Sequence, residues 1–74
     1  MSLARVIVTL RDSSPAGLDH ATEALKREGL TVERVLGAVG IVCGSVDQSC
    51  LPRLQSMAEV AAVEEEREVR TSAR

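Results

Sequence analysis

The stretch Arg5-Val6-Ile7-Val8-Thr9-Leu10 decides the fold of this chain. β-Branched residues fill its middle, and such residues favour strands that have at least one buried face. We therefore expect a strand here, in the centre of a sheet. Successive side chains of a strand point to opposite faces, which defines two sets of residues. Val6, Val8 and Leu10 are predicted to face the covering helices, and Ile7, Thr9 and Arg11 to face the other way.

A helix is predicted to follow over residues 15–28. Ser14 is placed to cap it, and Pro15 is favourable at the first helical position. Apolar residues then recur at helical spacing and form one stripe, made of Leu18, Ala21 and Leu25. Gly29 stands where a helix commonly ends, with Leu30 placed for the accompanying hydrophobic contact.

Three strands and a second helix complete the series. Residues 31–36 and 41–46 are predicted strands, and the glycines between them suit a tight hairpin. Asp47 or Ser49 can cap the second helix, and Pro52 favours Ser49 because proline is tolerated only in the first turn. Apolar residues repeating at Leu51, Leu54 and Met57 carry that helix to residue 58 or 59. Residues 61–69 alternate loosely and are predicted to form the last strand.

The predicted order is β-α-β-β-α-β. This order predicts a ferredoxin-like α+β sandwich, which is a four-stranded antiparallel sheet with two helices on one face. The 74 residues are predicted to form a single domain, because a chain of this size builds one core. We expect ordered structure over residues 4–69 and a flexible tail at 70–74. Since two helices cover only one face of the sheet, the other face meets water or a partner.

The uncovered face is where function is expected. In the last predicted strand, Val63 and Val69 have the parity that faces the helices. The residues predicted on the uncovered face are Ile7, Thr9, Ala62, Glu64 and Glu66, joined by Ile41 or Cys43. The part of this set made of Ile7, Thr9, Ala62 and Ile41 or Cys43 is more apolar than a solvated face requires. The alternatives are that scattered exposed aliphatic residues carry no function, and that the acidic run at residues 64–66 is a solvated edge that opposes aggregation.

Composition excludes several classes of function. The chain has no Phe, Tyr or Trp, so it lacks the stacking platforms of single-stranded nucleic-acid binders. Nine basic and eleven acidic residues give a net charge of −2, which argues against a polyphosphate partner. No apolar run reaches the roughly 18 residues of a membrane span, and residues 4–10 are too short for a signal peptide. We therefore expect a cytoplasmic protein with no nucleic-acid or membrane partner.

The two cysteines indicate neither a redox motif nor a metal site. Cys43 and Cys50 lack the Cys-x-x-Cys spacing, and His20, the only histidine, is distant in the sequence. We expect two reduced structural thiols, with a disulfide as the alternative. A metal site would lack ligands, so no metal and no cofactor is predicted.

Three segments occur in an order that is typical of a known family. They are the charged turn Arg11-Asp12-Ser13, the strand start Gly40-Ile41-Val42, and the string Val60-Ala61-Ala62-Val63-Glu64-Glu65-Glu66. Over nearly the whole chain, the sequence resembles the propeptide inhibitors of subtilisin-like serine proteases. Family members carry Val-Ala-Tyr-Val-Glu-Glu-Asp in the last string, where this chain has Ala62 for the tyrosine and Glu66 for the aspartate.

The resemblance implies a subtilisin-like serine protease as partner, with inhibition or assistance in folding as the role. The uncovered sheet face would pack against two parallel surface helices of the protease. Glu64 and Glu66 match the acidic positions that cap the N-termini of those helices, where a carboxylate meets unpaired N–H groups and the positive end of the dipole. Residues after the last strand would enter the protease cleft as an extended segment, comprising Val69, Arg70, Thr71 and Ser72.

A second likeness rests on Val32-Glu33, Leu36-Gly37, Val39-Gly40-Ile41, Gly44-Ser45-Val46 and Val63-Glu64-Glu65-Glu66. It is to short bacterial proteins of unestablished role that are often labelled ketohydroxyglutarate aldolase. A Schiff-base aldolase needs a desolvated lysine in a pocket that excludes water. Lys26, the only lysine, is predicted on the polar side of the first helix. We therefore predict that the chain is not an enzyme.

Two other readings stay open. Residues 12–18 and 28–32 resemble elements of ligand-sensing modules of the ACT type, which share this element order, bind amino acids at the start of the first helix, and would have to dimerise. The other is an assembly subunit whose uncovered face pairs with itself about a two-fold axis through Ile7 and Thr9. In that arrangement Glu64 and Glu66 are expected to lie near their mates and repel. We expect a monomer or a weak homodimer.

Overall fold

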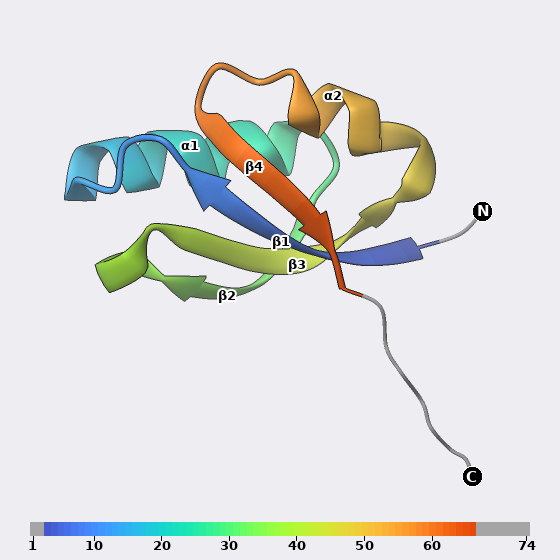
Figure 1. The fold of residues 1–74 in the computed structure, drawn as a ribbon, viewed down its shortest axis with the longest axis horizontal. Coiled ribbons are helices and arrows are strands. Elements are labelled where there is room, and N and C mark those ends of the chain that lie inside the picture. Colours follow the sequence, from blue (N-terminus) through green and yellow to red (C-terminus); the bar gives the residue numbers. More distant parts are fainter. Residues whose placement is uncertain (1–2, 67–74) are drawn as a thin grey trace, which may run out of the picture.

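A computed structural model describes residues 3–66, and its elements follow the predicted order (Figure 1). The strands are β1 (Leu3–Leu10), β2 (Thr31–Leu36), β3 (Ile41–Asp47) and β4 (Val60–Glu65). The helices are α1 (Pro15–Arg27) and α2 (Leu51–Gln55), and the 3-10 turns are η1 (Gly37–Val39) and η2 (Gln48–Cys50). The sheet has the order β2-β3-β1-β4, and every pairing is antiparallel. The predicted ferredoxin-like α+β class is confirmed, as is the hairpin of β2 and β3.

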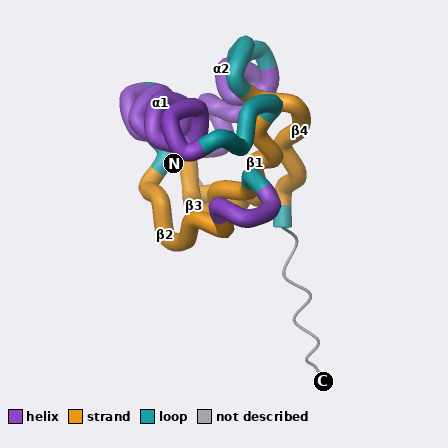
Figure 2. The backbone as a smooth tube through the Cα atoms, turned by 90° about the vertical axis from the view of Figure 1, so that its left-hand side faces the viewer, coloured by secondary structure: helices purple, strands orange, loops and turns teal. Residues whose placement is uncertain are grey.

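Both helices lie on the same side of the sheet (Figures 1 and 2). The core between the two layers is built on the central strand β1, of which alternate residues are buried. Val6 and Val8 retain at most 1% of their surface exposed, whereas Ile7 and Thr9 are half-buried. The largest fully buried side chains are Leu25, Leu54, Val6, Val8, Val42 and Val46. The predicted alternation of β1 is therefore confirmed, and no helix formed by residues 3–66 lies on the opposite side of the sheet.

The ends of α1 form as their sequence predicts. The Ser14 hydroxyl accepts a hydrogen bond from the backbone N–H of Gly17 at 3.2 Å, which caps the N-terminus. At the other end Gly29 has a φ of 104°, and the Leu30 N–H donates to the carbonyl of Leu25 at 3.1 Å. This is a Schellman arrangement, and the Leu30 side chain is buried, as is frequent at that position of the motif. The helix ends at Arg27, one residue before the predicted end.

The second helix is shorter than predicted. The Ser56 N–H bonds back to Pro52 and Arg53, while the Ser56 hydroxyl donates to the Pro52 carbonyl at 2.9 Å. The Met57 N–H bonds to Leu54, three residues back, which tightens and ends the helix. Met57 nevertheless packs against the core. Its helix-like spacing from Leu54 therefore reflects burial of its side chain and not a longer helix.

The predicted cap of α2 and the bounds of β4 also differ from the structure. Asp47, not Ser49, provides the side-chain cap, accepting from the Ser49 N–H at 3.0 Å at the start of η2. The intervening 3-10 turn leaves α2 itself without a side-chain cap. β4 begins at Val60 and ends at Glu65, earlier at both ends than predicted. Val69 lies outside the described residues.

A β-bulge in β2 changes which of its side chains reach the uncovered face. Val32 pairs with Gly44, but the next pair is Arg34 with Cys43, so Glu33 is the extra residue. The bulge brings the Thr31 carbonyl oxygen so close to Gly44 that a Cβ there would collide with it. As a result Arg34 lies on the uncovered face, although strict alternation would put it on the same face as Val32.

Replacing Ser14 with alanine is expected to lower the free energy of unfolding by about 1 kcal/mol, because the N–H of Gly17 loses its acceptor. Urea denaturation followed by circular dichroism measures the change. Ser13→Ala is the matched control, since the Ser13 side chain makes no hydrogen bond among residues 3–66. Equal stability of the two variants would contradict the capping role of Ser14.

Replacing Gly44 with alanine is expected to destabilise the chain by about 1–3 kcal/mol, as overpacking does. The added methyl group collides with the Thr31 carbonyl oxygen, so β2 must move away from β3. The urea midpoint measures the loss, with Ser45→Ala in the same strand as control. An unchanged midpoint for Gly44→Ala would show that the two backbones do not approach this closely.

Candidate functional site

The uncovered side of the sheet, called the open face below, is organised as three rows that cross the strands in the order β2, β3, β1, β4. Strand register defines them, because directly paired residues share a face. The apolar row is Leu36, Ile41, Thr9 and Ala62. The mixed row is Arg34, Cys43, Ile7 and Glu64. The polar row is Thr31, Ser45, Arg5 and Glu66, where the Glu66 N–H donates to the Arg5 carbonyl at 2.7 Å.

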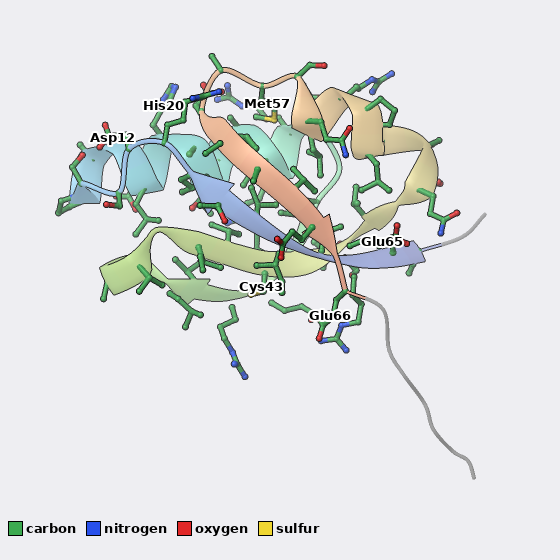
Figure 3. All side chains as sticks on the ribbon, in the orientation of Figure 1. Asp12, His20, Cys43, Met57, Glu65 and Glu66 are labelled. Atoms are coloured by element: carbon green, nitrogen blue, oxygen red, sulfur yellow. The ribbon has the colours of Figure 1, made fainter. Side chains whose placement is uncertain are left out.

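The structure brings together five residues that the sequence placed on this face. Ile7 and Thr9 are half-buried in its middle, and Ala62 and Glu64 are exposed along β4. Glu66 follows β4, and Figure 3 shows its side chain on the side away from the helices. Ile41 and Cys43 join them. Their role in binding a partner stays a prediction. The remaining site residues, Val69, Arg70, Thr71 and Ser72, lie outside the described residues.

Arg11 is not on the open face, and that prediction was wrong. β1 ends at Leu10, and its register against β4 shifts between Thr9 and Leu10. The alternation of the strand therefore no longer governs the next residue. Arg11 instead lines a hollow against α1 together with His20 and Glu59.

An ion-pair network occupies the polar end of the open face. Arg5 Nη2 is 3.0 Å from Glu33 Oε1, and Arg5 Nε is 4.0 Å from Glu66 Oε1. These side chains are about half exposed, so each pair contributes little, on the order of 0–1 kcal/mol. With Arg34, Ile7 and Cys43 they line a hollow of about 390 Å³. The face is thus indented and charged at this end.

The mixed row carries one unpaired charge at each edge of the sheet. Arg34 on β2 and Glu64 on β4 are exposed, and neither makes an ion pair with any residue from 3 to 66. Between them lie only the half-buried Ile7 and Cys43. Glu65, by contrast, pairs with Val6 and therefore points to the helix side. Of the adjacent residues Glu64 and Glu65, only Glu64 therefore has its carboxylate on the open face.

The opposite end of the open face is apolar. Leu36 is 39% exposed at the end of β2, and Val39 is 62% exposed in the adjoining turn η1. The apolar row continues through Ile41 and Thr9 to Ala62. Exposed aliphatic side chains that adjoin one another mark binding surfaces more often than scattered ones do.

Six residues of this face were not identified from the sequence: Arg5, Thr31, Glu33, Arg34, Leu36 and Ser45. Arg34 was missed because the bulge at Glu33 cannot be read from hydrophobic alternation. The one available signal was Gly44, a glycine within a predicted strand, since such glycines often mark a bulge or a close backbone approach.

The thiols and the lysine do not form a reactive site in the described residues. Cys43 lies on the open face, whereas Cys50 packs against the core on the helix side, so the sheet separates the two free thiols. No cluster of potential metal ligands occurs among residues 3–66. Lys26 is 51% exposed, with its Nζ 3.6 Å from Glu23 Oε2, which is not the desolvated setting of a Schiff-base lysine.

A separate hollow of about 250 Å³ lies at the start of α1. Its lining comprises Arg11, Asp12, Gly17, His20, Ala21, Ala58 and Glu59. Figure 3 shows Asp12 and His20 at this end of the molecule. His20 Nε2 is 3.3 Å from Glu59 Oε2. The backbone N–H of Ser14 bonds to Asp12 at 3.0 Å and, with the Ser14 hydroxyl, lowers the pKa of that carboxyl.

No family model matches the chain, and no curated protein has a significantly similar sequence. Among residues 3–66, neither helix combines the length and apolarity needed to cross a bilayer.

Proposed function

We propose that this chain is a protein-docking domain that binds a subtilisin-type serine protease through its open face, as a propeptide-like inhibitor or folding helper. The observation that carries the proposal is the position of Glu64. Its carboxylate stands on the bare side of the sheet beside Ile7, with no ion pair to any residue from 3 to 66. An available carboxylate next to an apolar surface suits the end of a partner's helix.

In the proposed complex, the apolar and mixed rows lie against the sides of two protease helices. Burial of Ile7, Ile41 and Thr9 would provide most of the favourable free energy. Glu64 would accept hydrogen bonds from the free N–H groups of one helix N-terminus. Glu66 would cap the second helix only after giving up its 4.0 Å contact with Arg5. We therefore expect Glu66 to contribute less to binding than Glu64.

The remaining features of the proposal concern residues and properties beyond the described fold. Val69, Arg70, Thr71 and Ser72 are proposed to follow β4 into the protease cleft in extended form. The chain itself is proposed to act without catalysis and without a cofactor. A cytoplasmic location is part of the same proposal, which makes a cytoplasmic subtilase the expected partner.

Replacing Glu64 with glutamine is expected to weaken inhibition of a purified subtilisin-type protease by about twofold to thirtyfold. This range corresponds to the roughly 0.3–2 kcal/mol of a carboxylate at a helix N-terminus. The inhibition constant is measured with a chromogenic peptide substrate. Glu65→Gln is the matched control, because Glu65 has the same charge and strand but points to the helix side.

A chain ending at Val69 tests the tail in the same assay. It is expected to bind the protease, as measured by calorimetry, but to inhibit it less than the full chain does. Inhibition that survives both Glu64→Gln/Glu66→Gln and this truncation would contradict the proposed mechanism. Absence of binding by the unaltered chain would contradict the proposed function itself.

The hollow at the start of α1 favours a second candidate function, the sensing of a small ligand such as an amino acid. Arg11 supplies a cation and Glu59 an anion at its rim, which suits the two charged groups of an α-amino acid. Gly17 leaves room for the carboxylate of Asp12 beside the hollow, because a Cβ at this position would collide with that carboxylate.

Titration with free amino acids is expected to shift the backbone amide NMR signals of Gly17 and Ala58, which line the hollow. Arg11→Ala is expected to remove those shifts, because the ligand carboxylate loses its cation. Arg27→Ala, an exposed arginine outside the hollow, is the control. Unchanged spectra with every amino acid at millimolar concentration would contradict this second function.

A further inference from the structure

The mixed row is complementary to itself. The row takes one residue from each of the four strands at the same level, namely Arg34, Cys43, Ile7 and Glu64. Its positive charge lies at the β2 edge of the sheet and its negative charge at the β4 edge. The centre of the row lies between β3 and β1. A half-turn about an axis parallel to the strands through this centre exchanges β2 with β4 and β3 with β1. The half-turn therefore creates two equivalent contacts, and in each of them Arg34 of one copy lies opposite Glu64 of the other copy.

We propose that two copies of this chain associate through their open faces about that axis. Two sheets pack face to face about 10 Å apart, a separation that a long arginine and a glutamate can span together. In the mixed row Cys43 then meets Ile7 of the mate, and both are already half-buried in one copy. Arg34 and Glu64, which find no ion-pair partner among residues 3–66, each gain one.

The other two rows are compatible with the same axis. In the apolar row, the large Leu36 meets the small Ala62 of the mate, and Ile41 meets Thr9. In the polar row, Arg5 contacts both Glu33 and Glu66 within each copy, so this end of the face carries one net negative charge per copy. Because the axis sets β2 of one copy on β4 of the other, Glu33 comes near Glu66 of the mate, and the ion pairs of Arg5 offset part of that repulsion.

The charges also select this axis over the alternative. A two-fold axis in the plane of the face but perpendicular to the strands would set β4 on β4, and so Glu64 on Glu64 and Arg34 on Arg34. Like charges juxtaposed across an interface oppose association. The repulsion expected between the glutamates from sequence applies to that second geometry and not to the proposed one.

This association would withhold the open face from any other protein, a consequence that rests on the proposed function. A protease and a second copy would use the same residues, Ile7 and Glu64 above all. The dimer of this chain would then have to dissociate before the protease could bind. Chains that are not bound to protease would be held as dimers in which the apolar row is covered. The total concentration of the chain would then set how much monomer is available to inhibit the protease.

Sedimentation equilibrium over a dilution series tests the proposal with the full chain. The unaltered chain is expected to dimerise, more weakly as salt screens the charges. Arg34→Glu and Glu64→Arg are each expected to weaken the dimer by at least about tenfold, because each places two like-charged pairs in contact. Combining both reversals in one chain, or mixing the two single variants, is expected to restore association.

Arg27→Glu is the control, since it makes the same change of charge on the exposed part of α1, away from the open face. A monomer at every concentration would overturn the proposal. So would single reversals that leave the dimer unchanged, or a double reversal that fails to rescue it. The two proposals fail separately: a dimer that no protease binds contradicts the proposed function alone, and a monomer that binds the protease contradicts the self-association alone.

Discussion

Burial of alternate side chains of β1 against the two helices is the interaction on which the rest of this structure depends. Val6 and Val8 are almost entirely removed from water, and they hold the central strand against Leu25 of α1 and Leu54 of α2. Burial of such side chains contributes roughly 1.5–3 kcal/mol each. Because both described helices lie on this side, the intervening residues of β1 form a second surface that neither helix covers.

That second surface owes its charge pattern to a backbone irregularity. The bulge at Glu33 advances the register of β2, and Gly44 permits it because its missing Cβ leaves room for the Thr31 carbonyl. Without the bulge Arg34 would point to the helix side. With it, Arg34 stands level with Glu64 across the full width of the sheet. A local departure from strand geometry thus creates a charge pair at opposite edges.

Both proposed occupants of the open face follow from the same residues. A protease helix and a second copy of the chain would each cover Ile7 and neutralise Glu64, the first with a helix N-terminus and the second with Arg34. The hollow beside α1 is separate from the open face, since it is lined by the loop between β1 and α1, by α1 itself and by the loop before β4.

The sequence by itself determined the order of elements, the buried alternation of β1, both caps of α1 and the position of Glu64 on the open face. These follow from local spacing, which a short window of residues records. Tertiary structure alone decided the placement of Arg34, because β3, which is a separate strand, sets the register of β2. The early end of α2 was missed although the contacts that accompany it are local: the Ser56 hydroxyl bonds to the Pro52 carbonyl four residues back, and the Met57 N–H bonds to the Leu54 carbonyl. Pairing between strands, unlike alternation within one, cannot be read from either strand separately.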